Sequence, residues 1–140
     1  AAVADYRPAQ AATTKMKRSG AEQATMTLEL VENPDIIKSV ANHSARPALV
    51  IGFAAETNDA HKHAKEKLHK KGLDAVVVND VSDPSIGFNS EQNAATLIYA
   101  QGEVVLPLQS KRQLSATLIR QIPQIFASQL ADTNPESMTK

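Results

Sequence analysis

Lys67 and Lys71 are the side chains whose spacing best suits anion chemistry in this sequence. Residues 60–71 are strong helix formers, and their narrow apolar stripe consists of Ala60, Ala64 and Leu68. The two lysines lie along the edge of that stripe, whereas the other charged side chains of the helix fall on its solvated side. This placement predicts a two-pronged anion site. The simpler alternative, sufficient for the pair alone, is that the lysine stems cover apolar surface near the helix C-terminus, where cations are favoured.

A second group of cations follows an aspartate near the start of the chain. Lys15, Lys17 and Arg18 stand within four residues, and because they repel one another they predict a mobile loop or flap. Asp5 follows the apolar segment 1–4, which has the pattern of a buried strand. A basic loop just after a strand that ends in an aspartate is what a nucleotide-phosphate site would use, although solvated basic loops are common.

Asn33-Pro34-Asp35 has the composition of a helix start. We expect Asn33 at the N-cap and Pro34 at the first helical position, with the helix running to about Asn42. Free backbone N–H groups at such a start attract phosphate or another polar group. Plain helix capping explains the tripeptide equally well without a ligand.

The sequence gives little support for the common nucleotide-binding, metal-binding or catalytic motifs. The five glycines are scattered and form neither a dinucleotide-binding fingerprint nor a P-loop. His61 and His63 are two residues apart on a helix, so they point to different faces and are interpreted as surface residues. There is no cysteine for a disulfide or a thiolate metal site. No Ser/His/Asp set stands out.

Charge and hydropathy narrow the class of protein further. The 15 basic and 15 acidic residues balance, which argues against nucleic acid or a membrane surface as partner. No apolar run approaches the roughly 18 residues of a transmembrane helix. No signal peptide is visible, so we expect a cytoplasmic protein.

The helix at 60–71 belongs to a strand–helix–strand unit. Residues 48–54 and 74–79 are short apolar runs typical of strands buried on both faces, and Gly72 suits the left-handed residue after a helix. Two parallel strands joined by a helix predict an α/β sheet. Ligands then bind outside the carboxyl ends of the strands, which here carry residues 53–56 and 79–81.

The other elements complete one domain. Residues 24–31 alternate as a half-exposed strand that could pair with another chain, and residues 94–99 and 103–108 predict a β-hairpin. Residues 110–130 are helical, with a kink or break near Gln121–Ile122 ahead of Pro123. We therefore expect a domain over 1–130 and a polar tail over 131–140. Because the chain opens on an apparent core strand without methionine, it suggests a piece of a longer polypeptide.

Seven segments occur in the order and spacing of a known family: AAVADYRPA, KMKR, NPDI, GFAAET, KGLD, NDV and GFNS. Through them the chain resembles the bacterial phosphopantothenate–cysteine ligases from Ala1 to about Leu130. The resemblance implies a three-layer Rossmann-like (ribokinase-like) α/β sheet with a β-hairpin and a flap, here lacking its amino-terminal half. In many bacteria this ligase is fused to a flavin-dependent decarboxylase, so FMN is expected in that domain and not in this chain.

The resemblance also implies a two-step reaction of coenzyme A biosynthesis. The carboxylate of 4′-phosphopantothenate attacks the α-phosphate of CTP, releasing pyrophosphate and leaving an acyl-cytidylate. The amine of L-cysteine then displaces CMP and forms an amide. Because carboxylate and triphosphate are both anionic, such a site needs lysines and Mg²⁺ to neutralise charge. The family is dimeric, which makes a homodimer the expected assembly.

Site residues are carried over by motif. Lys15 matches the family's essential lysine, and Asp5 lies near the triphosphate and its metal. The family's usual K-x-K-K appears as Lys15-Met16-Lys17-Arg18, which keeps all three charges. The resemblance further places the following residues against the nucleotide: Ala1, Asn33, Pro34, Asp35, Ile36, Phe53, Lys67 and Lys71.

Two questions stay open at the level of sequence. Lys71 should lie roughly 16 Å along the helix from residue 60, so it reaches the ligand of Phe53 only if the helix is tilted or the nucleotide elongated. The alternative to an enzyme is a non-catalytic nucleotide-binding or dimerisation fragment that needs the missing half for activity. A generic Rossmann-type oxidoreductase is disfavoured because the glycine fingerprint is absent.

Overall fold

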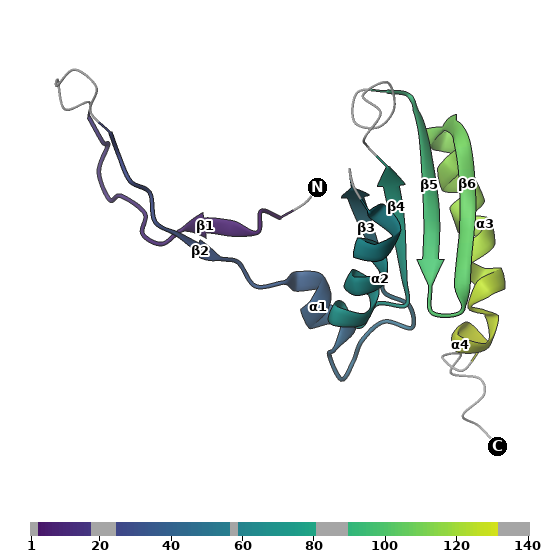
Figure 1. Ribbon diagram of the computed structural model, residues 1–140. Coiled ribbons are helices and arrows are strands. Elements are labelled where there is room, and N and C mark those ends of the chain that lie inside the picture. The colour runs from purple at the N-terminus through teal and green to yellow at the C-terminus, as the bar shows by residue number, and fades with distance from the viewer. Residues whose placement is uncertain (1–2, 18–24, 57–58, 81–89, 132–140) are drawn as a thin grey trace. The chain divides into compact units, whose positions relative to one another are not determined.

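The computed structural model describes residues 3–17, 25–56, 59–80 and 90–131. The chain divides into two units, Ala1–Ile36 and Ile37–Lys140, which we call the ribbon unit and the sheet unit. Figure 1 labels their helices and strands. Each unit is described by itself.

The ribbon unit is built on two short antiparallel strands, β1 (Tyr6–Pro8) and β2 (Leu30–Glu32). The backbone N–H of Asn33 donates to the carbonyl of Asp5 at 2.7 Å and extends the pairing beyond the strands. The strand predicted at residues 1–4 is wrong over its described part, because residues 3 and 4 are not in a strand and Val3 is 62% exposed. Ala1 lies outside the described residues.

The alternating segment 24–31 is also less regular than predicted. Only its last two residues belong to β2, and the apolar positions of the alternation, Met26, Leu28 and Leu30, are exposed. The partner strand β1 ends at Pro8 opposite Leu30, and beyond the two strands the Ala9 backbone N–H still donates to the Glu29 carbonyl at 2.9 Å. Alternation alone therefore does not determine the length of this strand.

The sheet unit contains a four-stranded sheet in the order β3-β4-β5-β6. Its strands are β3 (Ile51–Glu56), β4 (Ala75–Asp80), β5 (Gln92–Tyr99) and β6 (Gly102–Ser110). The first pair is parallel and the other two are antiparallel. The expected strand–helix–strand unit and hairpin are therefore confirmed, with strand bounds shifted by one to three residues.

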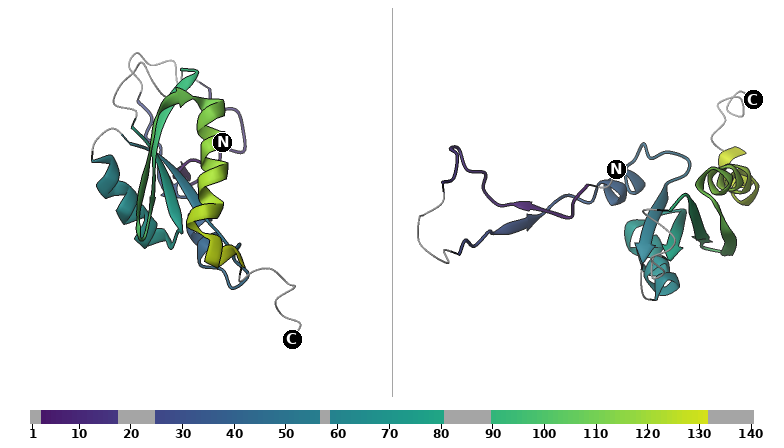
Figure 2. Two further views of the ribbon diagram at one scale, coloured as in Figure 1. Left: turned by 90° about the vertical axis from the view of Figure 1, so that its right-hand side faces the viewer. Right: turned by 90° about the horizontal axis from the view of Figure 1, so that it is seen from above.

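Helices cover both faces of this sheet, as the views in Figures 1 and 2 show. On one face, α2 (Ala60–Lys71) buries Ala64 and Leu68 against Val76, Val78 and Ile98. On the other face, α3 (Lys111–Ile125) buries apolar side chains against β4, β5 and β6, namely Leu114 and Leu118 on Ala75, Val77, Ala95, Leu97 and Leu106. The predicted three-layer α/β architecture is confirmed.

α2 begins and ends largely as the sequence predicts. Gly72 follows it with a left-handed φ of 70°, and a Cβ added there would lie 3.2 Å from the Asn42 side chain. Asp59 precedes it, also with a left-handed φ, and its side chain makes no capping hydrogen bond. The predicted apolar stripe is confirmed, because Ala64 and Leu68 are buried and Ala60 packs beside them.

The C-terminal helical region consists of two helices. A break was one of the two predicted alternatives, the other being a kink. Ser110 caps α3 through reciprocal hydrogen bonds with Gln113, and α4 (Ala127–Ala131) follows after Phe126. The break predicted near residues 121–122 is misplaced, because α3 continues through Pro123 to Ile125. The proline removes one donor, yet the Phe126 N–H still reaches the Ile122 carbonyl at 3.0 Å.

A short helix, α1 (Ile36–Ala41), precedes the sheet. Its end agrees with the prediction near Asn42, but its start does not, because Asn33 and Pro34 lie ahead of the helix. The Asn33 side chain has other partners. Its Nδ2 donates to the Ala4 carbonyl at 2.7 Å, and its Oδ1 accepts from Arg7 Nη1 at 3.0 Å.

Among the described residues, none of the helices has the length and apolar character needed to cross a membrane.

Candidate functional site

The carboxyl end of β3 presents an aromatic side chain and a carboxylate on opposite faces of the sheet. Ala54 packs under α2, so by strand alternation Phe53 faces the other side, where it is 73% exposed. Glu56, the last residue of β3, lies on the α2 side. The strand therefore places a stacking surface and an acid at the edge where α/β sheets bind ligands.

Glu56 is the centre of a cluster that we define as Glu56, His63 and Lys67. The Lys67 ammonium donates to Glu56 Oε1, and His63 Nδ1 lies 3.4 Å from Glu56 Oε2. The hydrogen bond from Lys67 outweighs the opposing effect of burial, and His63 adds to it, so the pKa of Glu56 lies below its ordinary value of 4.5. Glu56 is therefore an ionised, partnered carboxylate at neutral pH.

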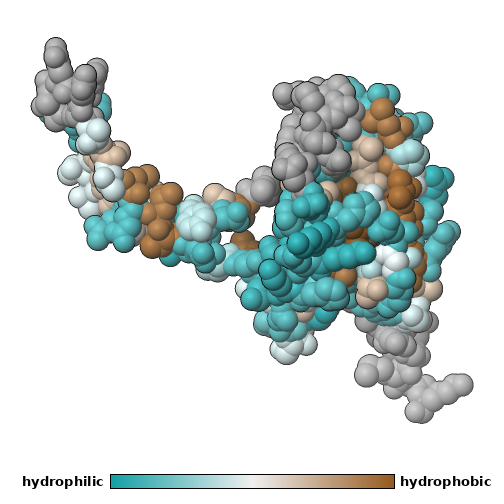
Figure 3. All heavy atoms as spheres, viewed as in Figure 1, coloured by the Kyte–Doolittle hydropathy of each residue, from teal (hydrophilic) through white to brown (hydrophobic). Residues whose placement is uncertain are grey.

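Lys67 reaches the carboxyl end of β3 although it lies seven residues into α2. Helical side chains lean toward the N-terminus of their helix, and the long lysine stem extends that reach. The predicted distinction of Lys67 and Lys71 from the other lysines is confirmed in their exposure: both are intermediate, whereas Lys62, Lys65 and Lys70 are exposed. Hydrophilic side chains gather over α2 in Figure 3.

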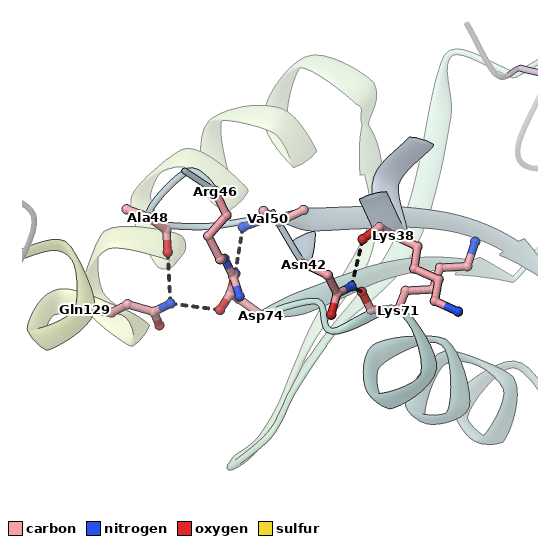
Figure 4. Close-up of polar contacts among 8 residues, drawn as sticks. All are labelled: Lys38, Asn42, Arg46, Ala48, Val50, Lys71, Asp74 and Gln129. Atoms are coloured by element: carbon pink, nitrogen blue, oxygen red, sulfur yellow. Dashed lines mark hydrogen bonds and ion pairs between the residues drawn. The ribbon is translucent and has the colours of Figure 1, made fainter. Parts of the chain in front are cut away.

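Lys71 lies at the opposite end of the helix. Its carbonyl accepts a hydrogen bond from Asn42 Nδ2 at 3.0 Å, and the same amide donates to the Lys38 carbonyl at 2.7 Å (Figure 4). Asn42 thereby ties the C-terminal turn of α2 to α1. The structure brings Lys67 to the Glu56 cluster and does not bring Lys71 there, so contact of Lys71 with the same ligand stays a prediction.

A second carboxylate, mostly shielded from solvent, lies near the amino ends of the strands. Asp74 accepts from the Val50 backbone N–H at 2.7 Å, from Gln129 Nε2 at 2.8 Å and from Arg46 (Figure 4). Gln129 also donates to the Ala48 carbonyl at 2.9 Å. We call this set the Asp74 junction. It fastens α4 and the segment before β3 to the start of β4, and no local sequence pattern indicates it, because Gln129 and Ala48 are 81 positions apart.

The ribbon unit holds the other predicted site residues that the structure describes. Backbone pairing brings Asp5 next to Asn33, and Arg7 Nη1 donates both to Asn33 Oδ1 and to the Glu32 carbonyl, at 2.8 Å for the latter. Lys15 is exposed and is not brought to these residues by any described contact. Pro34, Asp35 and Ile36 continue from Asn33 toward α1.

Sequence reasoning missed Glu56, His63 and Arg7. The spacing of His63 and Lys67 at i and i+4 on α2 was a usable signal, because it puts both side chains on one edge of the helix. The prediction that the histidines are surface residues agrees with their exposure, yet His61 Nδ1 also lies 3.3 Å from Glu103 Oε2. Arg7 gives no signal of its own, since its partners are more than 20 residues away.

The described residues contain no group of three side chains that could hold a metal ion by themselves. Mg²⁺ is commonly bound through one or two carboxylates together with substrate phosphates and water. The exposed carboxylate of Asp5 suits that mode, so the donor set fits a magnesium ion that arrives with a triphosphate and does not fit a resident metal centre within the described ranges.

Comparisons with known proteins agree on one family. Residues 1–126 match the model of the DNA/pantothenate metabolism flavoprotein C-terminal domain. The chain is 49% identical over 126 residues to the coenzyme A biosynthesis bifunctional protein CoaBC of Vibrio vulnificus strain CMCP6, covering 90% of this chain and 31% of that protein. It is 43% identical over 122 residues to the protein of the same name from Escherichia coli strain K12, covering 87% and 30%. The chain thus spans about a third of the length of these relatives.

Solved structures give the same result. The crystal structure of the C-terminal domain of a coenzyme A biosynthesis bifunctional protein CoaBC matches with a TM-score of 0.63 and 29% identity, covering 91% of this chain and 53% of that chain. The DNA/pantothenate metabolism flavoprotein from Streptococcus pneumoniae shares the fold, with a TM-score of 0.55 and 20% identity over 71% of this chain and 42% of that one. From the match over residues 1–126 and the identities above, the chain belongs to the DNA/pantothenate metabolism flavoprotein C-terminal domain family.

Proposed function

We propose that the chain is the nucleotide-binding part of a coenzyme A biosynthesis enzyme that ligates 4′-phosphopantothenate with L-cysteine at the expense of CTP. The observation that supports this most is the 49% identity, over 90% of the chain, to a protein named for coenzyme A biosynthesis. The motifs of the sequence add the reaction class and the nucleotide. CTP, Mg²⁺ and a homodimer belong to the same proposal.

The first step joins two anions. A carboxylate oxygen of 4′-phosphopantothenate attacks the α-phosphorus of CTP, the bond to the β-phosphate breaks, and pyrophosphate leaves. The repulsion between carboxylate and triphosphate must be offset by cations, and Lys15 and Lys67 are the side chains assigned to this task. Magnesium, when bound, would supply further neutralisation, and Asp5 would hold it together with the phosphates.

The second step forms the amide. The cysteine amine attacks the acyl carbon of the acyl-cytidylate, the bond to the phosphate oxygen breaks, and CMP leaves as the nitrogen loses a proton. Here the chain has mainly to orient the intermediate, and the exposed ring of Phe53 offers a flat apolar surface for the nucleotide. No covalent bond to the protein is needed in either step.

Lys67 has the geometry that this chemistry requires of a phosphate contact. Its ammonium has three hydrogen-bond donors, of which the hydrogen bond to Glu56 Oε1 uses one, and its side chain is 43% exposed. Two donors thus stay available at the carboxyl end of β3. The assignment of Lys71 to the same nucleotide would require the phosphates to extend along α2.

A chimera tests the proposed reaction. This chain replaces the 122-residue region that it matches in the Escherichia coli relative, and CTP-dependent pyrophosphate release is measured with 4′-phosphopantothenate. We expect release that needs CTP, that ATP does not support, and that falls at least tenfold with Lys15→Gln. Lys62→Gln, an exposed lysine on α2, is the matched control and should leave the rate unchanged.

Calorimetry on the chain alone separates the two classes of function. Selective binding of CTP with Mg²⁺, weakened by Lys15→Gln, together with an inactive chimera would favour a non-catalytic nucleotide-binding module. A chimera whose pyrophosphate release does not depend on which nucleotide is supplied would contradict the proposed reaction.

A further inference from the structure

The two oxygens of the Glu56 carboxylate face two different basic side chains of α2. Lys67 donates to Oε1, and His63 Nδ1 lies 3.4 Å from Oε2. His63 and Lys67 are one helical turn apart, so they project from the same edge of α2 toward the end of β3. One carboxylate therefore has two candidate hydrogen-bond partners at the same time.

The three side chains differ in how freely they can move. The Glu56 side chain is 15% exposed, whereas those of Lys67 and His63 are 43% and 45% exposed. A carboxylate with this little exposure is destabilised when its cation leaves, although only modestly because the cation itself is partly exposed. His63 beside the second oxygen reduces that cost, because the carboxylate keeps a hydrogen-bond partner when Lys67 leaves.

We propose that Lys67 exchanges between Glu56 and a phosphate group of the bound nucleotide, and that His63 takes over Glu56 while Lys67 is away. This rests on the proposed function in one respect, since the nucleotide is the ligand that draws Lys67 off. Glu56 and His63 are thus positioning residues, which act on the ligand through Lys67.

The proposed exchange gives Glu56 and His63 opposite effects on ligand binding. Glu56 competes with phosphate for Lys67, so it weakens binding, and it recovers Lys67 when pyrophosphate leaves. His63 has the opposite effect, because a Glu56 held by His63 releases Lys67 more readily. A merely structural ion pair would make both substitutions act in the same direction or not at all.

Calorimetric titration of this chain with CTP and Mg²⁺ tests the exchange. We expect Glu56→Gln to tighten binding by about two- to fivefold, because an ion pair of this exposure competes only modestly. His63→Leu should weaken binding by roughly two- to threefold. The double variant should bind like Glu56→Gln alone, because without the Glu56 carboxylate His63 no longer affects Lys67.

The matched controls lie on the same helix. Glu66→Gln removes a carboxylate that pairs with Lys70 on the solvated side, and His69→Leu removes an exposed histidine of the C-terminal turn. Both should leave CTP binding unchanged. Weaker binding in Glu56→Gln, or a His63→Leu variant that binds as the unsubstituted chain does, would overturn the exchange.

A second measurement needs no nucleotide. Brief acetylation followed by mass spectrometry reports how available the Lys67 amine is relative to the exposed Lys65. Glu56→Gln should raise the Lys67 to Lys65 ratio and His63→Leu should lower it. If neither ratio changes, the exchange is overturned whatever CTP does. If both change as expected but CTP does not bind this chain, the nucleotide part of the exchange is overturned, and the chimera decides separately whether the proposed function stands.

Discussion

Two carboxylates of the sheet unit have nearly the same burial and very different partners. The side chains of Asp74 and Glu56 are 12% and 15% exposed. Asp74 is held by a backbone N–H and a guanidinium from the segment before β3 and by an amide from α4. Among the described residues, the side chains that hold Glu56 are both basic and both from α2.

The difference separates a carboxylate held partly by the backbone from one held by side chains alone. A backbone N–H cannot leave its carboxylate without disturbing a strand, so Asp74 is fixed to the fold at the amino ends of the strands. Lysine and histidine side chains can rotate away while α2 stays in place, so Glu56 can change partners at the carboxyl ends. Burial alone does not distinguish these roles, whereas the origin of the partners does.

Asp74→Ala should give the largest loss of stability. It leaves the Val50 N–H, the Gln129 amide and the Arg46 guanidinium without their acceptor, which we expect to cost about 2–3 kcal/mol, or roughly 10 °C in Tm. Thermal unfolding followed by circular dichroism measures this. Glu66→Ala on α2 is the control and should shift Tm by little. A loss no greater than that of the control would show that the Asp74 junction does not stabilise the fold.

Lys67→Met tests the opposite end of the sheet. Its stability should change little because the side chain is 43% exposed, but CTP affinity should fall by about tenfold, since a charge-assisted hydrogen bond to phosphate is lost. Calorimetry with CTP and Mg²⁺ gives the affinity. Lys65→Met is the matched control. Equal losses in the two variants would mean that α2 attracts the nucleotide by net charge and not through Lys67.

The sequence predicted the sheet unit better than the Glu56 cluster, for a physical reason. The stripe of Ala60, Ala64 and Leu68 and the stop at Gly72 are local signals, and they defined α2 to the residue. The link from Glu56 to Lys67 depends on how α2 packs on β3, which no local pattern records. The sequence therefore distinguished Lys67 from its neighbours but could not identify Glu56 as its partner.

The ribbon unit was predicted least well because its contacts are non-local. Asn33 has the composition of an N-cap, yet its amide bonds to Ala4 and Arg7, more than 20 residues earlier, and α1 begins at Ile36 instead. The apolar alternation at Met26 and Leu28 predicted a strand, whereas β2 begins only at Leu30. The partners of Asn33 come from the facing part of the ribbon, which no local pattern records.

Gln129→Ala should have an intermediate effect on stability. It removes the donor shared by Asp74 and the Ala48 carbonyl but leaves the Val50 N–H and Arg46 in place, so we expect a loss of about 1 kcal/mol. Chemical denaturation measures it. In an Asp74→Ala background the same substitution should cost clearly less, because the two side chains share one contact. Simple additivity would show that Gln129 acts through Ala48 alone.

The smallest effect concerns the pH dependence of stability. The pKa of Glu56 lies below its ordinary value of 4.5 because Lys67 donates to it, so the native state binds its proton less tightly than the unfolded chain does. The stabilisation is therefore fully present above about pH 4.5 and is lost as the pH falls through the lowered native value. Denaturation between pH 7 and pH 3 should show the unsubstituted chain losing more stability than Glu56→Gln, by under about 1 kcal/mol. Glu66→Gln, which removes an exposed carboxylate paired with the exposed Lys70, should follow the unsubstituted chain. If Glu56→Gln does so too, Lys67 does not hold Glu56 in solution, and the contrast with Asp74 rests on the backbone contact of Asp74 alone.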